Sequence, residues 1–137
     1  MAKLPKPALA PVDWIGSAKD DVTRFPQEIK NELGQSLFVA QLGQLADNAK
    51  LMKGGELREV TEIVARDDDG TYRLMYTVKL GNRIYVLHAF QKKSTHGIAT
   101  PKRETDLIKQ RLLIARARAA SIAEPKTEAS SSKGKKK

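Results

Sequence analysis

The sequence contains no cysteine, and aromatic residues make up only 5% of it. Without cysteine, the chain can form neither a disulfide nor a thiolate metal site. Its two histidines lie in no zinc-binding motif, and no octahedral ligand set accompanies the acidic run at residues 67–69, so we expect no metal and no cofactor. No apolar run approaches the ~20 residues that a membrane-spanning helix needs. Disulfide-stabilised, thiolate-metal and membrane-spanning classes are therefore excluded.

The beginning of the chain also lacks the continuous apolar stretch of a signal peptide, because Pro5, Pro7 and Pro11 interrupt it. With 40% hydrophobic and 30% charged residues among 137, the composition is that of an ordinary globular protein. We expect one cytoplasmic domain over residues 12–121. A flexible segment, residues 1–11, precedes this domain, and a disordered basic tail, residues 122–137, follows it.

Positive charge is the main departure from an average composition. The chain has 25 Lys and Arg against 16 Asp and Glu, a net charge of +9. Residues 88–118 alone contain eight Lys or Arg against two acidic residues. A concentrated positive charge of this kind is typical of proteins that bind nucleic acid.

Hydrophobic periodicity predicts two helices in the first third of the chain, at residues 18–24 and from Pro26 onward, which together form a hairpin. Ser17 and Asp20 have the spacing of a capping box at the start of the first helix. The second helix carries an apolar stripe wide enough to cover a sheet, formed by Ile29, Leu33, Leu37 and Ala40.

Strand patterns follow a polar connector at residues 46–55. We expect strands at 57–65, 72–80 and 83–90, with residues 12–15 as a candidate edge strand. The turns at 67–70 and at Gly81–Asn82 are too short for parallel crossovers, so the strands form an antiparallel meander of three to four strands. In the second strand, alternation places Arg73 on the face opposite the apolar residues.

A basic C-terminal helix completes the predicted fold. Thr100 is its candidate N-cap, Pro101 its first residue, and it fades around residues 121–125. Its apolar stripe comprises Ile108, Leu112, Ala115 and Ala119. The fold class is therefore α+β, with a helical hairpin and a basic helix packed on a small antiparallel sheet.

Residues 90–101, FQKKSTHGIATP, are the most informative stretch. The third strand ends in Lys92 and Lys93, a polar loop then carries His96, and the basic helix begins directly afterwards. A strand end and a helix that both supply cations form a site suited to a polyanion.

Four short motifs together resemble the RelE/ParE superfamily of toxins, and within it the phage-derived, HigB-like branch of type II toxin–antitoxin systems. They are Leu57-Arg58-Glu59 in the first strand, Tyr72-Arg73 in the second, and then YVLHAFQKKS and TPKRE. The resemblance spans residues 12–120 and implies a RelE-like fold. It also implies an endoribonuclease that cuts mRNA, often on the ribosome, without a metal. In such enzymes the 2′-hydroxyl attacks the adjacent phosphate and leaves a 2′,3′-cyclic phosphate and a 5′-hydroxyl. A cognate antitoxin, often with a helix-turn-helix DNA-binding domain, is the implied partner.

This chemistry requires a base, a positive charge beside the phosphorane, and an acid for the leaving oxygen. The catalytic candidates are Arg73, Lys92, Lys93 and His96. Arg73 can grip a phosphate with two hydrogen bonds. The lysines can hold the phosphate backbone, or one can act as base with a pKa lowered by its cationic neighbours. His96 is suited to proton transfer near neutral pH.

The expected RNA-binding residues are Arg58, Phe90, Lys102, Arg103 and Lys109. Phe90 can stack on an unpaired base, and the cations can contact phosphates. His88 is expected to be a structural histidine on the same face as Val86 and Phe90. Two other functions fit the basic surface: a non-catalytic nucleic-acid-binding module such as a phage regulator, and a gyrase poison of the ParE type.

Overall fold

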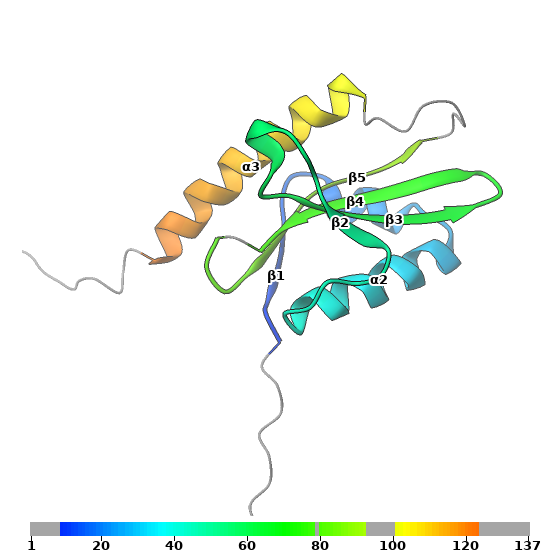
Figure 1. Ribbon diagram of the computed structural model, residues 1–137, viewed down its shortest axis with the longest axis horizontal. Coiled ribbons are helices and arrows are strands. Elements are labelled where there is room, and N and C mark those ends of the chain that lie inside the picture. The colour runs from blue at the N-terminus through cyan, green and yellow to red at the C-terminus, as the bar shows by residue number, and fades with distance from the viewer. Residues whose placement is uncertain (1–8, 79, 93–100, 124–137) are drawn as a thin grey trace, which may run out of the picture.

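A computed structural model describes residues 9–78, 80–92 and 101–123 of the chain. In this part a five-stranded sheet lies between helices (Figure 1). The elements in chain order are β1 (Val12–Trp14), α1 (Ala18–Thr23), α2 (Gln27–Gln41), β2 (Ala49–Leu51), the 3-10 helix η1 (Gly55–Leu57), β3 (Thr61–Asp67), β4 (Gly70–Thr77), β5 (Ile84–Lys92) and α3 (Lys102–Ala123).

The strand order in the sheet is β1-β5-β4-β3-β2. Strands β2 to β5 pair antiparallel, which confirms the predicted meander. β1 confirms the candidate edge strand and pairs parallel with β5. β2 is an additional strand within the predicted polar connector. It was not predicted because a strand of three residues is too short for a period of two to be recognised.

The first strand of the meander, β3, begins at Thr61 rather than at residue 57. The residues before it form η1, which follows Gly54 at a φ of 99°, a conformation that favours glycine. Leu57, the last residue of η1, is buried, and Arg58 directly after it is exposed. The prediction of Leu57-Arg58-Glu59 in a strand is therefore wrong. At the other end of the meander, β5 extends to Lys92, so Lys92 is part of the sheet.

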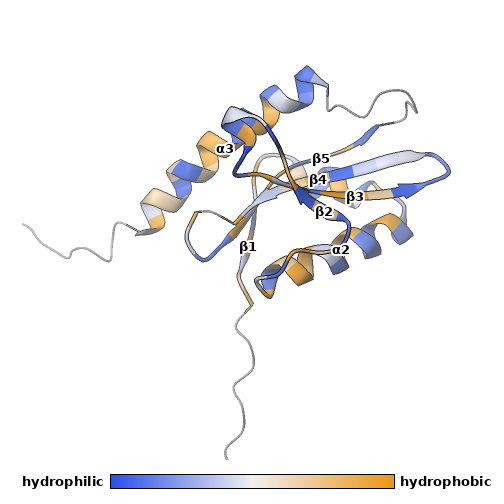
Figure 2. Cartoon of the chain, in the orientation of Figure 1, coloured by the Kyte–Doolittle hydropathy of each residue, from blue (hydrophilic) through white to orange (hydrophobic). Residues whose placement is uncertain are grey.

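Helices cover both faces of the sheet. α1 and α2 cover one face and α3 covers the other (Figure 1). Figure 2 shows apolar residues recurring along α2 and α3, and the buried ones pack in the two cores between these helices and the sheet. The predicted stripes are confirmed, since Leu33 of α2 and Leu112 of α3 are almost fully buried. The face that carries Arg73 is therefore not an open face. Met75, two residues along on the same face, is completely buried in the core under α3.

The start of α1 differs from the predicted capping box. Ser17 makes no side-chain cap at the helix start, and its hydroxyl donates instead to Asp21 Oδ2 at 2.9 Å. The hydroxyl oxygen of Ser17 also accepts a hydrogen bond from Arg111 of α3 at 3.1 Å. Ser17 therefore links the α1 end of the molecule to α3.

Among the described helices, none combines the length and the apolar character that crossing a membrane requires.

Candidate functional site

One end of the α3-facing side of the sheet carries polar side chains. Arg73 lies in β4 between Val64 of β3 and Phe90 of β5 in the strand pairing. Lys92 lies two residues beyond Phe90, on the same face. We call this region the strand-end site, which comprises Glu62, Arg73, His88, Phe90, Lys92 and Glu104 of α3.

A β-bulge in β5 sets the orientation of His88. The pairing passes from Met75 opposite His88 to Tyr76 opposite Val86, which leaves Leu87 as an extra residue. Leu87 and His88 therefore both face α3, while Val86 belongs to the core on the α2 side. Strict alternation predicts Val86 and His88 on one face, and the bulge makes this prediction wrong for Val86.

His88 is 5% exposed and is held from three directions. Its Nε2 lies 2.6 Å from Glu104 Oε1 in the first turn of α3. Its Nδ1 lies 3.4 Å from a guanidinium nitrogen of Arg111. Its ring stacks on Phe90 with centroids 5.3 Å apart and planes at 21°. His88 thus joins the end of β5 to the start of α3.

Arg111 connects α3 to two other elements. Its guanidinium donates to the Leu87 carbonyl at 3.1 Å and to the Ser17 hydroxyl at 3.1 Å. Gly16 lies directly against it, since a Cβ added there would be 2.7 Å from Arg111 Nε. Gly16 also has a φ of +59°. Glycine therefore permits both the turn before α1 and the close approach of the arginine.

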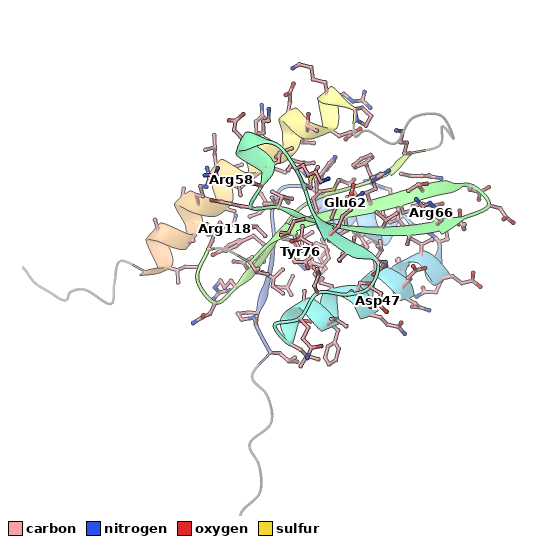
Figure 3. The ribbon with its side chains drawn as sticks, viewed as in Figure 1. Asp47, Arg58, Glu62, Arg66, Tyr76 and Arg118 are labelled. Atoms are coloured by element: carbon pink, nitrogen blue, oxygen red, sulfur yellow. The ribbon has the colours of Figure 1, made fainter. Side chains whose placement is uncertain are left out.

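Arg73 and Glu62 form a buried ion pair. Arg73 is 7% exposed and Glu62 3%, and a guanidinium nitrogen of Arg73 lies 2.5 Å from Glu62 Oε2. Lys50 of β2, which is mostly exposed, lies 4.0 Å from Glu62 Oε1. Figure 3 shows Glu62 over the centre of the sheet and Arg66 toward the β3–β4 turn. Arg73 is therefore not the solvent-facing strand arginine that the sequence predicts.

The predicted RNA-binding cations separate into two groups. Lys102 and Arg103 project into solvent from the first turn of α3, next to Glu104. The hydrogen bond to Asp106 raises the pKa of Lys102, so Lys102 remains a cation. Arg58 lies instead next to α3, just after η1 (Figure 3). Lys109 of α3 pairs with Glu56 of η1 at 3.2 Å. Only the first group adjoins the strand-end site.

The predicted catalytic residues have different outcomes. Arg73 and Lys92 lie on the same face of two adjacent strands. Phe90 is on this face too, since it pairs with Arg73 and precedes Lys92 by two residues. Lys93 and His96 lie outside the described residues.

Sequence reasoning missed two residues of the site, Glu62 and Glu104, and also Arg111, which contacts the site residue His88. Glu104 is part of the TPKRE motif. An acidic residue within a basic segment is the feature of the sequence that could have identified it. Glu62 lies within the predicted strand 57–65, but its ion pair with Arg73 depends on the pairing of β3 with β4, which one strand's sequence does not reveal.

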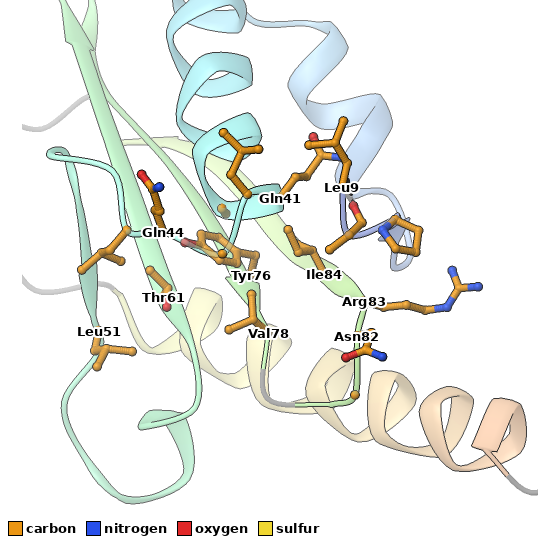
Figure 4. A pocket seen from close by; sticks show the side chains of 17 residues that line it. Leu9, Gln41, Gln44, Leu51, Thr61, Tyr76, Val78, Asn82, Arg83 and Ile84 are labelled. Atoms are coloured by element: carbon orange, nitrogen blue, oxygen red, sulfur yellow. Dashed lines mark hydrogen bonds between the residues drawn. The ribbon is translucent and has the colours of Figure 1, made fainter. Parts of the chain in front are cut away.

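A hollow lies at the end of the sheet opposite the strand-end site, on the α2 side. It has a volume of about 610 Å³ and is lined by residues such as Leu45, Leu51, Val78 and Ile84 (Figure 4). Arg83 is the only charged residue among those that line it in the described part of the chain. This apolar hollow is not suited to a polyanion, and the hollow is distinct from the strand-end site.

A protein-family model, Phage derived protein Gp49-like (DUF891), matches residues 20–113, which is more than half of the chain. The chain belongs to the Gp49-like family. This family is toxin-like and of the RelE/HigB type. The match extends from α1 to the middle of α3 and so includes the whole strand-end site. No curated protein matches the chain.

Proposed function

We propose that this protein is the toxin of a type II toxin–antitoxin system and cleaves mRNA as a metal-independent endoribonuclease, with ribosome-bound message as substrate. Membership of the toxin-like Gp49-like family supports the toxin class and implies a cognate antitoxin, which we expect to be a helix-turn-helix DNA-binding protein. The observation that carries the RNA assignment is the strand-end site, where an aromatic ring, sheet cations and a histidine–carboxylate pair occur together.

RNA binding at this site rests on stacking and on charge. Phe90 is partly exposed, and His88 supports one side of its ring, so the ring is a rigid platform for an unpaired base. Stacking of this kind contributes about 1–3 kcal/mol per base. Lys92, Lys102 and Arg103 supply positive charge for the phosphates on either side.

Cleavage at this site follows from the chemistry of RNA itself. The 2′-oxygen attacks the adjacent phosphorus, so the protein needs only acid–base groups and positive charge, and no metal takes part. Arg73 and Lys92 provide this charge from two neighbouring strands. Lys93 and His96 follow in the chain and are proposed as further catalytic residues. A phosphate that bonds to Arg73 has to compete with the Glu62 carboxylate.

A non-catalytic nucleic-acid-binding module is the second candidate function. It is favoured by the burial of Arg73 and by its ion pair with Glu62, both of which also occur in purely structural pairs. A gyrase poison is less well supported, since the strand-end site has groups for acid–base chemistry on RNA.

The test is to add the purified protein to translating ribosomes and to map the ends of the RNA. The proposal predicts new 5′-hydroxyl ends paired with 2′,3′-cyclic phosphates, and growth arrest in cells that lack the antitoxin. Intact message at an equimolar amount of protein contradicts the proposal. If binding persists without cleavage, the binding module is correct, and if RNA stays intact while DNA breaks accumulate, the target is gyrase.

A further inference from the structure

We propose that Glu104 is the general base that takes the proton from the attacking 2′-hydroxyl, and that His88 and Arg111 hold it in position. This inference rests on the proposed ribonuclease function and names the base of the same site. Sequence reasoning left the acid–base groups open and assigned Glu104 no role.

The two carboxylate oxygens of Glu104 have different surroundings. Oε1 is fixed by His88 Nε2 at 2.6 Å. Oε2 lies 3.5 Å from a guanidinium nitrogen of Arg103, whose side chain is 91% exposed. The side chain of Glu104 is itself 14% exposed. One oxygen is thus anchored to the sheet, and the other lies beside the exposed side chain of Arg103. A general base needs such an oxygen to reach a bound substrate.

The network around His88 determines its tautomer. A guanidinium can only donate hydrogen bonds, so the contact from Arg111 makes Nδ1 of His88 the acceptor. The ring proton then resides on Nε2 and is donated to Glu104 Oε1. Glu104 Oε1 accepts this hydrogen bond, so Oε2 is the oxygen left to take the proton of the substrate. Arg111 acts through His88 and is a positioning residue.

The stack of His88 on Phe90 relates the carboxylate to the substrate. Glu104 and Phe90 contact the same imidazole ring. A base stacked on the outer face of Phe90 therefore places its ribose near the start of α3. Lys92 lies two residues after Phe90 on the same face of β5, where we expect the next phosphate.

The step balances with groups of this chain. The 2′-oxygen loses its proton to Glu104 Oε2 and forms a bond to phosphorus. The bond from phosphorus to the 5′-oxygen breaks, and that oxygen takes a proton from the Lys92 ammonium. The products are a 2′,3′-cyclic phosphate and a 5′-hydroxyl. Glu104 then returns its proton through solvent, and Lys92 is protonated again.

The experiment measures kcat and KM for cleavage of a ribosome-bound message across pH, with wild-type protein and Glu104→Gln. General-base catalysis makes the wild-type rate fall at acidic pH. The charged groups that face this carboxylate are His88 of β5 and Arg103 of α3, with Arg111 behind His88. We expect Glu104→Gln to lower kcat by about 10²–10⁴-fold, to change KM little, and to abolish the acidic decline.

Two further variants distinguish catalysis from a structural role. Glu59→Gln makes the same chemical change at a carboxylate that also pairs with an α3 cation, Arg116 at 2.9 Å, and should leave kcat unchanged. Glu104→Asp retains a carboxylate one methylene shorter and should retain the acidic decline at a reduced kcat. Wild-type kcat and an unchanged pH profile in Glu104→Gln overturn this inference while the ribonuclease function stands. A wild-type protein that cleaves no RNA overturns the proposed function first, and this inference with it.

Discussion

At the scale of single residues, the strand-end site combines two buried hydrogen-bonded pairs with side chains that reach solvent. Arg73 with Glu62 and His88 with Glu104 are fixed by the sheet and by α3. Phe90 and Lys92 are partly exposed next to them. Buried charged groups of this kind are costly unless each has its partner. The fixed pairs thus position the site, and the exposed side chains are the ones that we propose to bind RNA.

Replacing Arg73 with Ala should destabilise the fold as well as the site. The substitution leaves the Glu62 carboxylate buried without its guanidinium partner, which costs about 3–5 kcal/mol of unfolding free energy. Urea denaturation measures this loss. Arg66→Ala, at an exposed arginine of the neighbouring strand, is the matched control and should change stability by about 0.5 kcal/mol or less.

A double variant separates stability from activity at this pair. Glu62→Leu with Arg73→Met removes both charges, so it should recover most of the lost unfolding free energy. It should not recover RNA cleavage. Full cleavage by a stable double variant would show that Arg73 has no part in the reaction.

Replacing Phe90 with Ala should weaken RNA binding by about 1–3 kcal/mol, because a stacked base loses its platform. Fluorescence anisotropy with a short single-stranded RNA gives the dissociation constants. Phe38→Ala is the control, since Phe38 is an exposed phenylalanine of α2 on the other side of the sheet, at 47% exposure. Equal affinities for the two variants would argue against stacking on Phe90.

At the scale of elements, three segments distant in sequence meet at Arg111. Arg111 lies in the middle of α3, and the turn before α1 and the bulge of β5 both contact its guanidinium. This contact fixes α3 relative to β5, and so fixes Glu104 relative to His88. The position of Glu104 relative to His88 therefore depends on a residue seven positions further along the same helix.

Replacing Gly16 with Ala should destabilise the protein by about 1–2 kcal/mol, because a side chain is strained at a φ of +59°. The added Cβ also pushes against Arg111. Gly34→Ala should instead stabilise the protein by about 0.5–1 kcal/mol, because Gly34 lies inside α2 and an added Cβ meets open space. Thermal unfolding of the two variants compares them directly, and a shift of the same sign in both would contradict this description.

The elements show what the sequence could and could not reveal. Periodicity identified α2, α3 and the meander because long amphipathic segments dominate the local pattern. It could not identify the bulge at Leu87–His88, which depends on pairing with β4. It also placed Arg73 on an open face, since a single strand does not reveal that α3 covers that face. Lys92 and Phe90 were found because both follow directly from the strand that carries them.

At the scale of the whole molecule, the two ends of the sheet have opposite character. The strand-end site is polar and faces α3, and the hollow near Leu45 and Val78 is apolar and lies on the α2 side. Positive charge also concentrates toward the C-terminal third of the chain. RNA is therefore expected at one end of the molecule, on the side of α3.

Cleavage through the 2′-hydroxyl is tested with a message that has one 2′-deoxynucleotide at a mapped cleavage position. Without the 2′-hydroxyl there is no nucleophile at that phosphate. With translating ribosomes and wild-type protein, we predict that cleavage disappears at this position and continues at all others. The same substitution at an uncleaved position serves as the control. Unchanged cleavage at the deoxy position would contradict the account, because it requires a nucleophile other than the RNA itself.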